Sequence, residues 1–198
     1  MFFLNFLQNI YIFIFSKKIF HFLNKIILHL SLKSLGYKNH GSFFVTGEAF
    51  VINKIKKFGI NLSLDIGAHQ GSYTKLLLEK TNSNVIAFEP FDENCNKIAK
   101  MNKKNLSRLI IKKIALSDRR KSKKIYFFDK KSQLSSFSEK IKNFSYNKNK
   151  KLNFTKIKTD TLDNHIKRDL KKFNYKIDFI KIDTEGHEYE VILGAQNI

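Results

Sequence analysis

Hydrophobic and polar positions repeat with two alternating periods from about residue 60 to the end of the chain. Short apolar runs of strand length, separated by segments with helical spacing, cover residues 60–67, 84–90, 109–118 and 176–183. Alternation of buried strands with helices is typical of parallel βαβ units that are covered on both faces. We therefore expect four parallel strands in the order 3-2-1-4, and a last helix after the fourth strand with Asp183 or Thr184 as its N-cap.

The segments between the strands have their own patterns. Helical spacing predicts helices over residues 72–80, 92–105 and 161–173. Residues 119–158 are more polar, and the stretches "KKIYFFD" and "KLNFTKIKT" within them predict a pair of strands. The Lys, Ser and Asn residues between these two stretches predict a flexible connection.

The first thirty residues are dense in Phe, Ile and Leu, but polar residues interrupt them at Asn5, Gln8, Asn9, Lys17 and Lys18. No uninterrupted apolar run reaches the roughly 18 residues that a membrane span requires. A secretory signal would need an early positive charge and a small-residue cleavage site, and neither is visible. Two interpretations stay open: helices that pack on the domain, or an amphipathic segment on a membrane surface with its lysines toward the headgroups.

Length and composition fit one globular domain with an N-terminal appendage, because 198 residues with 42% hydrophobic residues can bury one sizeable core. We expect a hydrophobic helical segment over residues 1–40 and the domain over 41–198. The net charge of +20 comes mostly from lysines spread along the chain, which a genome rich in A and T explains as well as a ligand does. Clustered arginines with interleaved aromatics are missing, so we expect no nucleic-acid partner. The single cysteine, Cys95, favours a reducing, cytoplasmic setting.

Acidic residues and glycines mark the ends of the first two predicted strands. In an open parallel sheet, ligands bind beyond the carboxyl ends of the strands, where Asp65 and Glu89 lie. Gly67 and Gly71 would let the backbone turn tightly and approach a ligand, and the next helix would offer N–H groups to an anion. An ionised Glu89 could accept both hydroxyl hydrogens of a ribose. Singly, Asp65 could instead cap a turn, and Glu89 could belong to an ordinary helix start.

The glycine pattern argues against a dinucleotide cofactor. A dinucleotide-binding loop needs the spacing G-x-G-x-x-G, and His69 occupies the place of its second glycine. The acidic pair with this loop therefore indicates a nucleoside-containing cofactor of another kind.

The motifs "LDIGAHQGSYT", "VIAFEP", "IALSD", "TLD" and "IDFIKIDTEGHEYEVILGA" resemble, in order and spacing, the FkbM family of S-adenosylmethionine-dependent methyltransferases. The resemblance implies a class I methyltransferase-like, Rossmann-like α/β fold, with a parallel sheet and helices on both faces. It also implies O-methylation of sugars or natural-product hydroxyls. Because the family's sheet continues with further strands after this last helix, we expect a domain truncated at its C-terminus.

The same resemblance assigns the cofactor contacts residue by residue. Asp65, Gly67 and Gly71 would lie against the methionine part of S-adenosylmethionine, and Glu89 would hold its ribose. Ser117 and Asp118, with Leu116, would face the adenine. Ala68 and Pro90, within the same two motifs, are also expected to contact the cofactor.

Three polar residues after the fourth predicted strand are candidates for catalysis. A hydroxyl acceptor must lose its proton, and Asp183, Glu185 or His187 could act as the general base. They could instead hold a divalent metal that lowers the acceptor's pKa. The structural alternative has Asp183 as a helix cap and the other two in an exposed first turn.

From the sequence we therefore expect an S-adenosylmethionine-dependent O-methyltransferase acting on a hydroxyl of a sugar, a glycan or a related small molecule, without a bound metal. The competing interpretation is a truncated, non-catalytic copy of the fold that serves as a membrane-surface or interaction module, with residues 1–30 as its peripheral membrane contact. A nucleic-acid methyltransferase is disfavoured because "DTEG" stands where an Asn-Pro-Pro-aromatic motif would follow the fourth strand.

Overall fold

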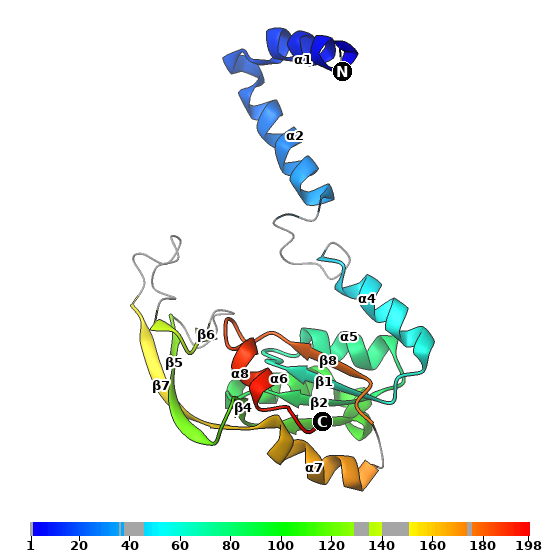
Figure 1. Ribbon diagram of the computed structural model, residues 1–198, viewed down its shortest axis with the longest axis vertical. Helices are drawn as coiled ribbons and strands as arrows, with labels where there is room; N and C mark the ends of the chain where they lie inside the picture. Colours follow the sequence, from blue (N-terminus) through cyan, green and yellow to red (C-terminus); the bar gives the residue numbers. More distant parts are fainter. Residues whose placement is uncertain (1, 36, 38–45, 129–134, 140–150, 174–175) are drawn as a thin grey trace. The chain divides into compact units, whose positions relative to one another are not determined.

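A computed structural model gives the arrangement of the chain (Figure 1). It describes residues 2–35, 37, 46–128, 135–139, 151–173 and 176–198. The chain divides into two compact units, residues 1–51 and 52–198, and each is described by itself. The expected domain boundary at residues 40 and 41, and most of the connection expected to be flexible, lie outside the described residues.

Two helices joined by a short 3-10 turn make up most of the N-terminal unit: α1 (Phe2–Phe15), η1 (Lys18–Phe20) and α2 (His21–Ser34). The amide of Asn24 donates a hydrogen bond to the carbonyl of Phe15 at 2.8 Å, which satisfies a backbone group at the end of α1. Helix α4 (Glu48–Ile55) crosses into the second unit and continues as η2 (Lys56–Phe58). No helix among the described residues is long and apolar enough to cross a membrane.

The central sheet of the second unit has four parallel strands in the order β3-β2-β1-β8, which confirms the expected order. Its strands are β1 (Leu62–Ile66), β2 (Asn84–Phe88), β3 (Leu109–Lys112) and β8 (Phe179–Ile182). All five residues of β1 are buried, as their apolar run predicts for the middle of a parallel sheet.

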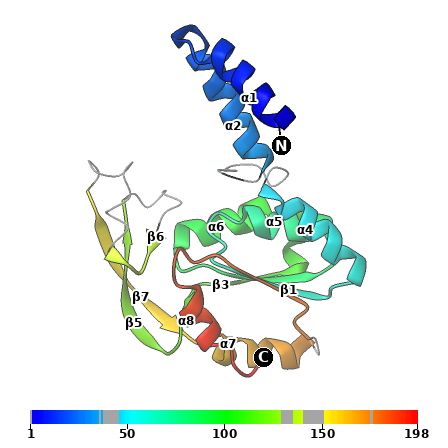
Figure 2. The ribbon, with the colours of Figure 1, turned by 45° about the horizontal axis from the view of Figure 1, so that its top comes forward.

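Helices cover both faces of this sheet. Figure 2 shows α5 (Ser72–Lys80) and α6 (Asp92–Met101) on one face, while α7 (Leu162–Phe173) and α8 (Glu188–Leu193) lie on the other. A 3-10 segment, η3 (Lys103–Arg108), leads from α6 into β3. The core on the α7 side joins Leu64 and Ile66 of β1 to Leu162, Ile166 and Val191.

A second sheet, in the order β4-β7-β5-β6, contains the predicted strand pair. Its strands are β4 (Ala115–Leu116), β5 (Lys121–Phe127), β6 (Ser135–Ser136) and β7 (Asn153–Asp160), with β5 and β7 antiparallel over seven residue pairs. The prediction of a single strand over residues 109–118 is wrong. The chain turns at Lys112, whose carbonyl accepts a hydrogen bond from the N–H of Ile114. The remainder, β4, then pairs with β7 instead of continuing the central sheet.

The expected start of the last helix is also wrong. Its N-cap is His187 rather than Asp183 or Thr184, and no side chain caps it. Instead, Glu188 Oε1 accepts hydrogen bonds from Thr184 N, Thr184 Oγ1 and Gly186 N, which holds the preceding residues in a turn. Glu185 and Gly186 have φ values of 54° and 93°, so a helix cannot begin before them.

Candidate functional site

The end of β1 carries a buried carboxylate with a cation beside it. Asp65 is fully buried, and its Oδ2 accepts a hydrogen bond of 2.6 Å from Thr74 Oγ1 at the start of α5. Its Oδ1 accepts no hydrogen bond from the described residues and lies 3.3 Å from Lys181 Nζ. The same ammonium group is 3.4 Å from Asp183 Oδ2 and donates to the carbonyl of Gly67. Charges of both signs therefore lie together at this sheet edge.

The loop after β1 is fastened to the neighbouring strands. The N–H groups of Gly67 and Ala68 both donate to the carbonyl of Phe88, the last residue of β2. Gly67 has a φ of +77°, and a Cβ there would lie 2.0 Å from the carbonyl oxygen of Asp183. Gly71 has a φ of +86°, and its Cβ would lie 2.8 Å from Ile98 in α6. Close packing within the chain therefore already requires these two glycines, whatever ligand approaches them.

Glu89 follows β2 and is buried, with several donors aimed at its carboxylate. Oε1 accepts hydrogen bonds from Phe91 N and Asn94 Nδ2, and Oε2 accepts one from His69 N, all at 3.0 Å. Burial raises the pKa of Glu89, while these donors oppose that shift. A carboxylate has about four acceptor positions, so Oε2 can accept one further hydrogen bond. Pro90, between Glu89 and Phe91, is half-buried.

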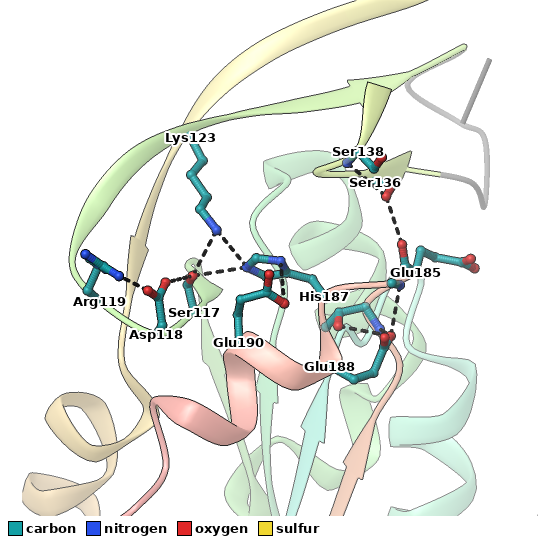
Figure 3. A network of polar contacts seen from close by, with 12 residues as sticks. Ser117, Asp118, Arg119, Lys123, Ser136, Ser138, Glu185, His187, Glu188 and Glu190 are labelled. Atoms are coloured by element: carbon teal, nitrogen blue, oxygen red, sulfur yellow. Dashed lines mark hydrogen bonds and ion pairs between the residues drawn. The ribbon is translucent and has the colours of Figure 1, made fainter. Parts of the chain in front are cut away.

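A second polar cluster surrounds His187, which lies between β8 and α8 (Figure 3). Its Nε2 is 3.0 Å from Ser117 Oγ and 3.2 Å from Lys123 Nζ, and its Nδ1 is 3.2 Å from Glu190 Oε2. Ser117 Oγ donates to Asp118 Oδ1 at 2.8 Å, and Lys123 donates to the Ser117 hydroxyl. Strand β5, the turn after β4 and helix α8 each supply part of this cluster.

The surroundings of His187 favour its neutral form. Its side chain is 3% exposed, and burial, with the nearby Lys123, lowers its pKa below 6.5. Glu190 is placed to accept the proton on Nδ1, which leaves the lone pair on Nε2 toward Lys123 and Ser117. Burial also lowers the pKa of Lys123. A neutral imidazole oriented by a carboxylate is a suitable proton acceptor.

An open pocket of about 420 Å³ lies beside this histidine. The ring of Phe137, just after β6, has its centroid 4.2 Å from that of His187. Cationic, aromatic and acidic side chains line the pocket, among them Lys123, Lys124, Tyr126, Phe137, His187 and Glu190. A polar ligand with an apolar face would find partners for both parts here.

The three catalytic candidates do not form one group. Asp183 is 61% exposed and pairs with Lys181, while the Glu185 side chain points away from His187 (Figure 3). The carbonyl of Glu185 accepts a hydrogen bond from Ser136 Oγ, and burial with nearby acidic groups raises its carboxyl pKa. No cluster of three metal-binding side chains occurs in the described part of the chain. The alternative that His187 lies in an exposed first turn is wrong, because His187 is buried.

The predicted adenine loop lies next to His187. Ser117 is fully buried and contacts His187, and Leu116 is part of the core. Hydrogen bonds from Arg119 and Ser117 hold the pKa of Asp118 well below its usual range. Among the described residues, no hydrogen bond or ion pair joins Asp65 or Glu89 to this cluster. The loop from Asp183 to His187 connects the two.

Sequence reasoning missed Lys181, Lys123 and Glu190. Lys181 lies two residues before Asp183, and residues with this spacing in a strand have their side chains on the same side. The "KID" spacing therefore could have indicated that Lys181 lies near Asp183. Glu190 follows His187 by three residues, which is the spacing of neighbours on a helix. Lys123 gives no such signal, because it comes from the second sheet.

The fold is that of an α/β protein, and the predicted ligand residues lie at the carboxyl edge of its parallel sheet, where enzymes built on such sheets bind their ligands. A family model described as the methyltransferase FkbM domain matches residues 65–198. The chain therefore belongs to the FkbM methyltransferase family, as its motifs predicted. No curated protein and no solved structure matches the chain. Methyltransferases of this kind typically take their methyl group from S-adenosylmethionine.

Proposed function

We propose that this chain is a class I, S-adenosylmethionine-dependent O-methyltransferase that acts on a hydroxyl of a sugar or glycan-related molecule. The observation that carries the proposal is the buried His187, oriented by Glu190 at 3.2 Å and lining a pocket with an aromatic wall. The family match supports methyl transfer. The strand order of the central sheet supports the class I assignment.

The residues at the sheet edge fit the cofactor. Its amino-acid part carries an ammonium and a carboxylate, and Asp65 Oδ1 and Lys181 offer one charge for each. Glu89 Oε2 has an acceptor position for a ribose hydroxyl. When bound, the cofactor supplies a methyl group already activated by its sulfonium sulfur. The protein must then align the acceptor oxygen and exclude water.

The pocket beside His187 suits the acceptor. Phe137 and Tyr126 can stack on the apolar face of a sugar ring, and the lysines can donate hydrogen bonds to its oxygens. His187 Nε2 would take the acceptor's proton, and Glu190 would stabilise the resulting imidazolium through Nδ1. Lys123, which now donates to Nε2, would turn to the acceptor oxygen.

Titration calorimetry with S-adenosylmethionine and S-adenosylhomocysteine tests the cofactor assignment. Glu89→Gln removes a charged acceptor, so we expect roughly 10- to 100-fold weaker binding. Glu79→Gln, an exposed change in α5, is the matched control and should bind as the wild type does. Unchanged affinity in Glu89→Gln would remove the ribose assignment, and a folded wild-type protein that binds neither compound would contradict the proposed function.

A further inference from the structure

The N-terminal helices expose an unusual amount of apolar surface. Most of their large hydrophobic side chains are exposed, including Phe3, Leu4, Phe6, Leu7, Ile10, Phe13, Ile14, Phe22, Leu23, Ile26, Ile27 and Leu30. Exposed apolar surface of this extent marks a site that contacts a membrane or another protein.

Helical spacing gathers part of the polar positions of each helix on one side. In α1, Asn5, Gln8 and Asn9 are spaced by three and four residues and so share one stripe. In α2, the apolar positions 22, 23, 26, 27 and 30 share one face, and His21 and Lys25 lie on the other together with Leu28 and Leu32. Each helix therefore has an apolar face, and in α1 the residues from Ile10 to Phe15 are apolar all round.

The turn between the helices is closed by its own side chains. Tyr11 donates a hydrogen bond of 2.7 Å to Asn24 Oδ1, and the Asn24 amide donates to the Phe15 carbonyl. The rings of Tyr11, Phe15 and Phe20 contact one another in sequence, with centroids 4.8 and 5.0 Å apart. Satisfying a backbone carbonyl at a helix end is what an apolar environment demands.

Neither helix can span a bilayer. Each contains 14 residues, which at 1.5 Å per residue is about 21 Å, against a hydrocarbon core of about 30 Å. A short helix with an exposed apolar face can lie in the plane of the membrane interface instead.

The lack of acidic residues in this segment favours an anionic partner. Residues 1–47 contain no Asp or Glu, whereas Lys17, Lys18, Lys25 and Lys33 lie in or between the two helices. We propose that α1, η1 and α2 bind the surface of a bilayer containing anionic lipids, with the apolar faces in the interface and the lysines at the headgroups. A second copy of the chain would bring like charges together, so self-association is disfavoured. This inference does not depend on the proposed function.

Vesicle flotation of the full chain tests the inference. Phosphatidylcholine vesicles with phosphatidylglycerol should carry the protein upward, and vesicles without it should bind much less. Each lysine near an anionic surface strengthens binding about fivefold, so Lys17→Glu with Lys18→Glu should weaken it by at least about 25-fold. Phe22→Asn with Ile26→Asn should abolish binding, because the apolar face then resists insertion.

The matched control is Lys103→Glu with Lys104→Glu, an exposed adjacent pair in η3 that changes the net charge equally and should bind as the wild type does. Equal losses in the two lysine pairs would overturn the inference, because binding would then reflect net charge alone. So would equal binding to both vesicle types. A stable dimer in light scattering without vesicle binding would overturn it in favour of a second copy.

Discussion

Replacing Gly67 by alanine tests the close contact between the first strand and the last. The new Cβ would lie 2.0 Å from the carbonyl oxygen of Asp183 and 3.3 Å from Thr184 Cγ2. That carbonyl cannot simply rotate away, because it shares its peptide plane with the N–H of Thr184, which donates to Glu188 Oε1 at 2.8 Å. The substitution must therefore separate the ends of β1 and β8.

Two costs add at this position. A non-glycine residue at φ +77° costs about 1 kcal/mol, and forcing a methyl group into a packed site costs about 1 to 3 kcal/mol more. We expect the free energy of unfolding to fall by about 2 to 4 kcal/mol.

Urea denaturation followed by circular dichroism measures this loss. Gly59→Ala is the matched control, since Gly59 has a φ of +64° but nothing within 4 Å of its Cβ position. It should lose only about 1 kcal/mol, the conformational cost alone. Equal losses at the two glycines would refute the close contact between the Gly67 position and Asp183.

Three further changes test the site. His187→Gln should lower the rate of methyl transfer by about a hundredfold to ten-thousandfold, while its affinity for the cofactor is retained. His165→Gln in α7 is the control and should retain activity. An assay with a radiolabelled methyl group and a panel of sugars compares the two variants. Because burial lowers the pKa of His187, the wild-type free energy of unfolding should fall as the pH drops below 6.5, and it should fall less in His187→Gln. Urea midpoints measured at several pH values test this. Equal declines in the two proteins would mean that other groups cause the pH dependence. Lys181→Met leaves the buried Asp65 without that cation and should destabilise the protein by about 3 kcal/mol in urea, more than Lys75→Met.

The sequence pattern predicted the central sheet well, because its two middle strands, β1 and β2, are buried on both faces. The run from Leu62 to Ile66 is apolar apart from two residues, Ser63 and Asp65, and both are buried with partners. The break after Lys112 was missed since Ile114 and Ala115 continue the apolar run. What distinguishes β4 from β3 is that β4 pairs with β7, more than forty residues later in the chain. The local hydrophobic pattern contains no information about that pairing.

The site shows the same division between local and distant information. Asp65 and Glu89 were found because strand ends are visible in sequence. The burial of His187 was not found, because Lys123 of the second sheet and Phe137 just after β6 cover it. Their positions depend on how the polar stretch after β4 folds back.

The turn at Lys112 has an evolutionary consequence. It sends the chain out of the central sheet into a separate one, and that sheet with the residues just after β6 supplies much of the pocket wall, including Lys123, Tyr126 and Phe137. Asp65 and Glu89 come from the other sheet. On the proposed function, acceptor preference can therefore diversify through exchanges within residues 121–160, while cofactor recognition is inherited unchanged.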